Sequence, residues 1–177
     1  MRLALADPVA VIPGVGRRTA AALGTAGIHA VADLLWHLPR RWEDRVSPAA
    51  LHEVREGGEA VTVCGRLVDL KLRRVRARLS IVEAVLSDGE TSLAVVWFNP
   101  PYLARTLHIG QRLWLHGPVR PGRLAGLHLQ SPEWEADADD GEALHHGRIV
   151  PVYRRLGFLT GRRLRALMFR VLKDLDP

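Results

Sequence analysis

The spacing of hydrophobic residues divides the chain into three parts. Up to about residue 50 apolar side chains recur at helical spacing, and Pro39 ends a helical pattern formed by Val31, Leu34, Leu35 and Leu38. From about residue 58 to residue 135 apolar and polar positions alternate, as in strands. Near the C-terminus a last helix is predicted, which Thr160 caps and whose apolar face comprises Leu164, Leu167, Met168, Val171 and Leu172.

The central part contains five predicted strands. AVTVCGRLVDLKL and VRARLSIVEAVL meet at Arg73–Arg74, where the alternation changes phase, so a turn or bulge is expected there. An Asp-Gly hairpin signal in SDGETS leads to LAVVWF, and PYLARTLH forms a short helix. QRLWLHGPVRPGRLAGLHLQ then makes a hairpin at Pro121–Gly122. Three strands, a helix and two strands are the order of an OB-fold, a five-stranded Greek-key barrel; an antiparallel sandwich is the alternative.

The predicted class is therefore α+β, mostly β, with four consecutive segments. A helix-hairpin-helix-like extension covers 1–50 and the barrel covers 51–135. An acidic connection covers 136–147, and it overlaps the stretch EWEADADDGE, residues 133–142, which we expect to be solvated. An extended piece and a helix cover 148–177. The chain ends just after that helix, so we expect a longer protein.

The charge of the chain points to a polyanionic partner. The net charge is +6, although six of the 19 acidic residues crowd into EWEADADDGE. All basic residues except Lys71 and Lys173 are arginines, whose planar guanidinium binds two phosphate oxygens at once. A GC-rich genome is the other explanation for this arginine bias. No apolar run is long enough to span a bilayer, and the lone Cys64 reads as a buried hydrophobe, so a cytoplasmic protein is expected.

Three short segments carry candidate binding chemistry. KLRRVRARL gathers Lys71, Arg73, Arg74, Arg76 and Arg78 without an acid among them, with Arg74, Arg76 and Arg78 expected on one face. This cluster falls on an OB-fold loop that binds oligonucleotides, and a solvated strand face is the alternative. PGVGRRTAAAL matches a helix-hairpin-helix turn, in which Gly14, Gly16, Arg17 and Arg18 contact a phosphate or serve only packing.

LPRRWEDR, residues 38–45, is expected to form local Arg–carboxylate pairs, with Trp42 anchoring a loop to the barrel, and direct DNA contact is the alternative. In WFNPPYL, Trp97 continues the buried phase of its strand while Phe98 lies on the opposite face. The prolines then end the strand and hold Tyr102 nearby. Aromatics packing the barrel rim are the plain alternative.

Catalytic and metal-binding signals are absent from the sequence. There is no G-x-x-x-x-G-K-[ST] segment for ATP, and no arrangement of nucleophile and base. His145 and His146 are neighbours, but two histidines lack the three or four ligands that a metal site needs, and they read as polar residues of a mobile segment. We predict no catalytic residue, metal or cofactor within this chain.

Several phrases together resemble the N-terminal region of the RecG-type ATP-dependent DNA helicases. They are, in order, PGVGRRTAAALGTAGIHAVADLLWHLPRRWEDR, WFNPPYLARTLHIGQRLWLHGPV, LAGLHLQSPEWE and RIVPVYRRLGFLTGRRLRALM. The resemblance implies the wedge domain, an OB-fold with helical additions, which precedes two motor domains that use ATP and Mg²⁺. It implies branched DNA as partner, namely stalled forks and four-way junctions, in fork reversal, recombination and repair in the bacterial cytoplasm at the nucleoid.

The resemblance also implies roles for two aromatic residues. In the family phrase FNxPY a Phe and a Tyr stack on bases at the branch point, and the matching positions are Phe98 and Tyr102. This chain has Pro100 where the family often has Gln, which stiffens the loop. A monomer without a membrane partner is expected. The alternatives are a stand-alone OB-fold that binds single-stranded nucleic acid and a protein-interaction domain.

Overall fold

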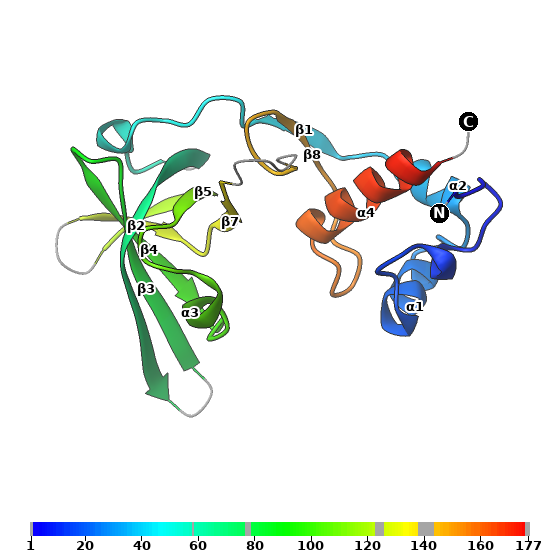
Figure 1. Ribbon diagram of the computed structural model, residues 1–177, viewed down its shortest axis with the longest axis horizontal. Coiled ribbons are helices and arrows are strands. Elements are labelled where there is room, and N and C mark those ends of the chain that lie inside the picture. Colours follow the sequence, from blue (N-terminus) through cyan, green and yellow to red (C-terminus); the bar gives the residue numbers. More distant parts are fainter. Residues whose placement is uncertain (1, 58, 77–78, 123–125, 138–143, 176–177) are drawn as a thin grey trace. The chain divides into compact units, whose positions relative to one another are not determined.

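The structure is a computed structural model that describes residues 2–57, 59–76, 79–122, 126–137 and 144–175. By contacts the chain forms two compact units (Figure 1). Met1–Asp44 and Arg148–Pro177 make one, called here the helical unit. Arg45–Gly147 make the other, the barrel unit. The first and last predicted segments of the chain thus fold together, although about 100 residues separate them.

The barrel unit is a six-stranded sheet, in which five strands close into a barrel and β7 pairs with β5. Its elements are η2 (Leu51–Glu53), β2 (Ala60–Arg76), β3 (Leu79–Ser87), β4 (Ser92–Phe98), α3 (Leu103–Thr106), β5 (Arg112–Pro121), β6 (Leu127–Gln130) and β7 (Glu133–Ala136). The pairing runs β2-β3-β4-β6-β5 and closes through β2–β5. Only β4 and β6 are parallel among these pairs. The predicted order of three strands, a helix and two strands, and with it the OB-fold, is confirmed.

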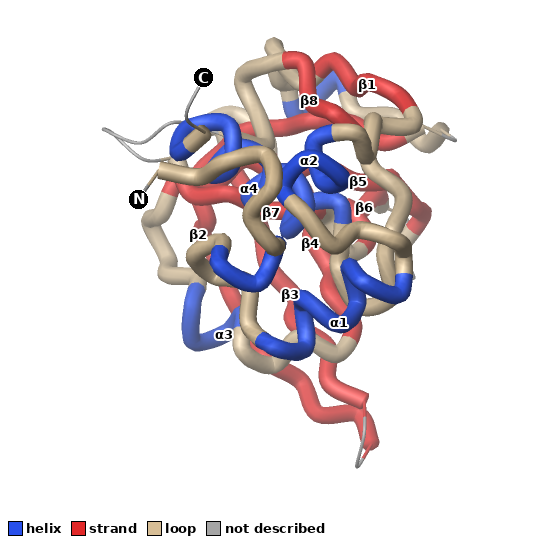
Figure 2. Tube along the Cα trace, turned by 90° about the vertical axis from the view of Figure 1, so that its right-hand side faces the viewer, coloured by secondary structure: helices blue, strands red, loops and turns tan. Residues whose placement is uncertain are grey.

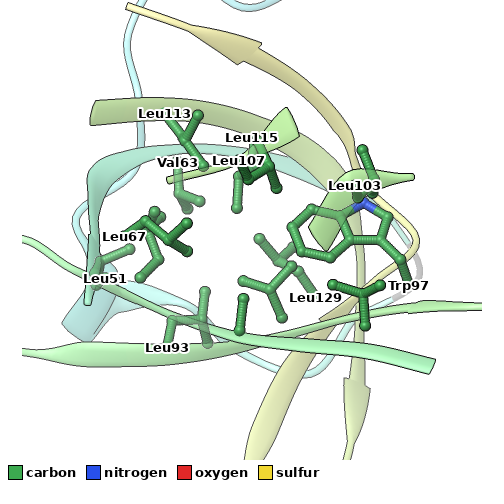
Figure 3. Packing of buried hydrophobic residues seen from close by; sticks show 14 of the residues in the cluster. Leu51, Val63, Leu67, Leu93, Trp97, Leu103, Leu107, Leu113, Leu115 and Leu129 are labelled. Carbon is green, nitrogen blue, oxygen red and sulfur yellow. The ribbon is translucent and has the colours of Figure 1, made fainter. Parts of the chain in front are cut away.

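Alternate side chains of each strand fill the barrel. On β4 the residues Leu93, Val95 and Trp97 are buried, while the residues between them lie towards the outside. Leu103 and Leu107, at the two ends of α3, add to the same core (Figure 3). The alternation of apolar and polar residues therefore indicates which side chains point into the barrel, because only the outer face of the sheet meets water.

The β2–β3 hairpin extends beyond the rest of the barrel (Figures 1 and 2). β2 continues through Arg73–Arg74 as far as Arg76, so of the two predicted alternatives, a turn or a bulge, the bulge is present. The register shifts between Arg74 and Arg76, and a second shift lies between Leu67 and Asp69. Each shift inserts one residue and exchanges the two faces of the strand without ending the ladder. Residues 77 and 78 lie outside the described residues.

The start of the acidic stretch is structured, contrary to expectation. Glu133–Ala136 form β7, which pairs with β5. Glu133 accepts a hydrogen bond from the buried Arg45 at 2.9 Å, and Glu135 accepts from His146 at 2.6 Å. His145 and His146, predicted to be mobile, are both buried. The two carboxylates have partners that lie far away in the sequence, which is why local composition did not reveal them. Residues 138–143 of the predicted connection lie outside the described residues.

The helical unit has its own hydrophobic core. Its elements are η1 (Val9–Val11), α1 (Arg17–Thr25), α2 (Val31–Leu35), β1 (Arg41–Asp44), β8 (Ile149–Val152) and α4 (Gly161–Asp174), with β1 and β8 antiparallel. The core joins both ends of the chain, because Leu23 and Leu34 belong to one buried cluster with Leu164. Among the described residues no helix is long and apolar enough to cross a membrane.

Three predictions for this unit need correction. α2 ends at Leu35, and Leu38, expected on its apolar face, is exposed. LPRRWEDR contains the strand β1 in place of a loop, and Trp42 is exposed, whereas the expected local pair is present between Arg41 and Glu43 at 2.6 Å. In α4 the cap is confirmed, because Thr160 Oγ1 accepts from the Arg163 amide at 3.4 Å. Leu172 is nevertheless exposed, because it lies on a side of the helix away from the core, while the adjacent Val171 is buried in it.

Candidate nucleic-acid interface

The end of β4 places two aromatic rings in opposite environments. Trp97 is 4% exposed, and its indole Nε1 donates to the carbonyl of Pro132 at 2.9 Å inside the barrel. The next residue, Phe98, pairs with Ile81 of β3 and is 43% exposed on the outer face. Both positions agree with the alternation in the sequence. Phe98 is thus a ring that the core does not use.

The chain leaves the strand through Asn99. Its φ of 62° is in the left-handed region, which Asn tolerates better than most residues. Its amide donates to the Ser80 carbonyl at 2.7 Å, and its side-chain oxygen accepts from the Ser80 amide at 3.2 Å. The turn therefore begins at Asn99, before the prolines, which the sequence indicates as the end of the strand.

Tyr102 follows at the start of α3 and is 61% exposed. Its carbonyl accepts from the amides of Arg105 and Thr106, and the Leu103 amide donates to Pro100. Leu103 is buried in the barrel core, so the backbone that carries Tyr102 is anchored on both sides. A second exposed ring is consequently held close in sequence to Phe98 on a well-bonded backbone.

The cations of the β2–β3 hairpin do not lie free of acids. Arg73 donates to Glu83 of β3 at 3.0 Å, and Lys71 donates to Asp69 at 2.5 Å. The hydrogen bond to Lys71 lowers the pKa of Asp69, and in return the pKa of Lys71 is raised. The sequence showed no acid within the cluster because one partner precedes it and the other comes from the neighbouring strand.

The hairpin arginines are also divided between two faces. Arg73 pairs with Ile81, which pairs with Phe98, so these three residues form one row across the outer face of the sheet. Arg74 pairs with Ser80 and Arg76 with Leu79. Arg73 and Arg74 are consecutive on β2, so their side chains lie on opposite faces, while the shared face expected for Arg74, Arg76 and Arg78 stays a prediction. Arg78 and the side chain of Arg76 lie outside the described residues.

The predicted glycine turn precedes α1 in the helical unit. Gly14 has a φ of 88°, which excludes most other residues, and Gly16 is the N-cap of the helix. Arg17 and Arg18 occupy the first turn of α1 and are exposed. Arg18 lies over the ring of Phe158, 4.5 Å from its centroid. The four residues singled out in the sequence are therefore gathered at one surface of this unit.

Other sequence signals lead to structural roles. His146 lies against Trp114, with ring centroids 4.4 Å apart. Cys64 is half-buried beside Arg112 on β5, and burial raises the pKa of its thiol. Within the described part of the chain no group of three or more metal-binding side chains converges. The α4 arginines Arg163 and Arg170, which sequence reasoning passed over, are exposed near the glycine turn, and only the fold reveals this.

Comparison with known proteins agrees with this architecture. The chain is 30% identical over 173 residues to the ATP-dependent DNA helicase RecG of Pasteurella multocida, and 29% identical over 165 residues to that of Thermotoga maritima. These matches cover 97% and 92% of this chain. They cover 24% and 20% of the relatives, so the chain spans about a quarter of their length or less.

A solved structure of RecG bound to a three-way DNA junction superposes with a TM-score of 0.80 at 27% identity. That match covers 97% of this chain and 23% of the other. The sequence model described as the RecG wedge domain matches residues 8–174, which include both units. The chain belongs to the RecG wedge domain family.

Proposed function

We propose that this chain is the branched-DNA-binding, strand-separating wedge of an ATP-dependent DNA helicase. The observation that carries the proposal is the pair of exposed rings, Phe98 and Tyr102, at the end of a barrel strand. The likeness to RecG bound to a three-way junction supports it. The rings stack on the bases exposed where two DNA arms separate, and the barrel behind them keeps the strands apart.

The energies involved are of matching size. Opening a fork by one base-pair step costs about 1.4 kcal/mol of stacking. A base that stacks on an aromatic side chain recovers about 1–3 kcal/mol. Two rings on a backbone fixed by Asn99 and Leu103 therefore offset much of the cost of holding one step open. The wedge binds a branch point but has no means of moving it.

The hairpin cations contact the sugar-phosphate backbone beside the branch point. Lys71, Arg73 and Arg74 are exposed, and Arg73 lies in the same row as Phe98. Arg76 and Arg78 belong to the same proposed contact. Binding of DNA requires Arg73 and Lys71 to exchange a carboxylate for a phosphate. Such exposed ion pairs contribute about 0–1 kcal/mol, so the exchange costs little.

Gly14, Gly16, Arg17 and Arg18 are proposed to contact phosphates as well. ATP hydrolysis with Mg²⁺ belongs to motor domains outside this chain, and the chain itself is non-catalytic and needs no cofactor. Its partners are forks, four-way junctions and those motors. We place this monomeric wedge at the nucleoid in the bacterial cytoplasm, where it serves replication fork reversal, recombination and repair.

The test is binding of the chain to a model fork, a blunt duplex and a single strand of equal length. Phe98→Ala and Tyr102→Ala each lower fork affinity by about 5- to 150-fold, which corresponds to 1–3 kcal/mol, while duplex affinity is unchanged. Phe98→Tyr and Tyr102→Phe keep a ring and retain fork affinity.

Fork affinity within about twofold of the parent in both alanine variants would refute the stacking role. Equal affinity of the parent for fork and single strand would instead favour a single-strand-binding OB-fold.

A further inference from the structure

A groove in the helical unit lies between the glycine turn and α4. Its volume is about 230 Å³, and it is lined by Gly14 and Thr19 on one side and by Arg163, Ala166 and Arg170 on the other. The two sides are joined by a hydrogen bond, because Arg170 Nη1 donates to the Pro13 carbonyl at 3.0 Å. A Cβ at Gly14 would lie 3.5 Å from the same nitrogen, an ordinary contact distance, so the φ of 88° and not lack of space favours glycine here.

The groove is bordered by arginines that have no acidic partner. Arg163, Ala166 and Arg170 follow one another at helical spacing on an exposed face of α4. Arg17 and Arg18 are exposed on α1. Among the described residues, none of these four arginines forms an ion pair with a carboxylate. The helices do not explain the charge, because cations in the first turn oppose the helix dipole.

Phe158 holds two of these guanidinium groups in place. Arg18 lies 4.5 Å and Arg163 5.9 Å from the centroid of its ring. A guanidinium that stacks on a ring keeps its N–H groups in its own plane, where they remain available to oxygen acceptors. Together with the bond from Arg170 to Pro13, this contact limits the freedom that the side chains lose when an anion binds.

The dimensions of the row fit a nucleic-acid strand. Seven residues of α-helix separate Arg163 from Arg170, which is about 10 Å along the axis. Successive phosphates of one strand rise about 3.4 Å along the duplex axis and also turn about it, so two guanidinium groups about 10 Å apart reach two different phosphates of a strand. Ala166, between the two arginines, has a small exposed side chain that lets a backbone approach closely.

We propose that this groove binds the sugar-phosphate backbone of one duplex arm, as a second DNA contact besides the branch-point rings. The inference rests on the proposed function, since it takes the arm from a branched substrate. It adds Arg163 and Arg170, with Ala166 as the point of closest approach, to Arg17 and Arg18. The contact reads no base, so it adds affinity for any DNA arm and no preference for forks.

The first experiment lowers the positive charge of the groove without removing an arginine. Ala166→Glu places a carboxylate between Arg163 and Arg170, and Ala166→Gln is the matched uncharged control. Both are good helix formers, so the fold is retained in each. Binding of a labelled 20-base-pair blunt duplex at low salt is expected to fall at least about fivefold in Ala166→Glu relative to Ala166→Gln, because two cations are lost to phosphate. Equal duplex affinities in the two variants would overturn the proposal.

The second experiment counts the phosphate contacts. The double variant Arg163→Ala/Arg170→Ala lowers the slope of log affinity against log salt by about two, since each phosphate contact contributes about 0.9. Arg154→Ala/Arg155→Ala, which removes two exposed arginines outside the groove lining of the same unit, is the control. Equal slopes in the two double variants would overturn the proposal.

The two proposals fail separately. If Phe98→Ala leaves fork preference intact while the groove variants lose duplex affinity, the branch-point role fails and the groove contact stands. If fork preference depends on Phe98 but Ala166→Glu binds duplex as well as Ala166→Gln does, only the groove contact fails.

Discussion

The hairpin of the barrel unit and the groove of the helical unit both concentrate positive charge, yet the charge is held differently. In the hairpin, Arg73 has Glu83 as a partner and Lys71 has Asp69. In the groove, Arg163 and Arg170 face no carboxylate among the described residues. A run of basic letters is thus a poor guide to available charge, because a strand receives partners from its neighbour, whereas an exposed helix face receives them mainly from its own turns.

The two regions also differ in how they use aromatic rings. The barrel unit exposes Phe98 beside the buried Trp97, so a ring is available for a base. In the helical unit Phe158 is covered by the guanidinium groups of Arg18 and Arg163. The first arrangement suits recognition of an unpaired base, and the second suits a backbone contact. Four predictions test this division, in order of decreasing effect.

Trp97→Ala tests whether the two adjacent rings of β4 have separate roles. We expect it to lower the free energy of unfolding of the barrel unit by about 3–5 kcal/mol, since it leaves a cavity and frees the Pro132 carbonyl. Phe98→Ala is expected to cost about 1 kcal/mol or less. Urea unfolding followed by amide exchange of the barrel strands measures both. Equal costs would show that Phe98 also serves the core.

Glu133→Gln tests whether buried charge in the barrel unit is structural. Arg45 is 3% exposed and would lose its ionised partner. The side chain of Glu133 is 38% exposed, so solvent moderates the loss to about 1–3 kcal/mol of unfolding free energy. Glu59→Gln, at an exposed site before β2, is the control. Equal losses of unfolding free energy in the two variants, measured by denaturant titration, would show that the Arg45–Glu133 pair does not stabilise the barrel unit.

Glu83→Gln tests whether cross-strand pairing restrains the hairpin. Without its carboxylate, Arg73 is fully available to phosphate, so the salt slope of DNA binding is expected to steepen by about 0.9. Stability changes by less than about 1 kcal/mol, because the pair is exposed. Anisotropy titrations at several salt concentrations give the slope, with Glu90→Gln in the β3–β4 turn as control. An unchanged slope would place Arg73 away from DNA.

The smallest expected effect is on the pH dependence of stability, to which Asp33 contributes in the helical unit and Asp88 in the barrel unit. Hydrogen bonds from the amides of Ala30 and His29 lower the pKa of Asp33. Amides of Thr91 and Glu90 lower that of Asp88. A carboxyl group whose pKa is lowered in the folded state stabilises the fold at pH values above its ordinary pKa of 3.8. That stabilisation is lost as the pH falls through the pKa of the folded state.

Asp33→Asn should therefore flatten the acid decline in stability of the helical unit, and Asp88→Asn that of the barrel unit. Amide exchange in each unit, measured from about pH 3 to about pH 6, where carboxyl groups titrate, separates the two effects. A steeper decline in either variant would contradict the assignment.

The barrel was predictable because its evidence is local. Alternation along β4 separates Trp97 from Phe98, and the order of elements selects the OB-fold. The position of the β2–β3 turn was not predictable in this way. A bulge between Arg74 and Arg76 shifts the phase as a turn does, and the pattern of letters does not separate the two.

The candidate sites also differ in whether one local segment or several distant segments form them. Phe98 and Tyr102 were found from one continuous phrase, and both prove to be exposed. The partners of Arg73 and Glu135 were missed because they come from other strands or from distant segments. The groove was missed because its two sides, Gly14 and Arg170, are brought together only by packing around a shared core.

The sequence by itself determined the order of the barrel strands β2 to β6, which face of β4 meets the core and where two aromatic rings remain outside it. These properties follow from the two-residue period of a strand, which neighbours along the chain define. Tertiary structure alone decided which charges remain available to DNA. Neutralisation of an arginine depends on which carboxylates lie within about 4 Å of it in space, and Glu83 and Glu133 reach Arg73 and Arg45 from segments whose meeting only the fold arranges.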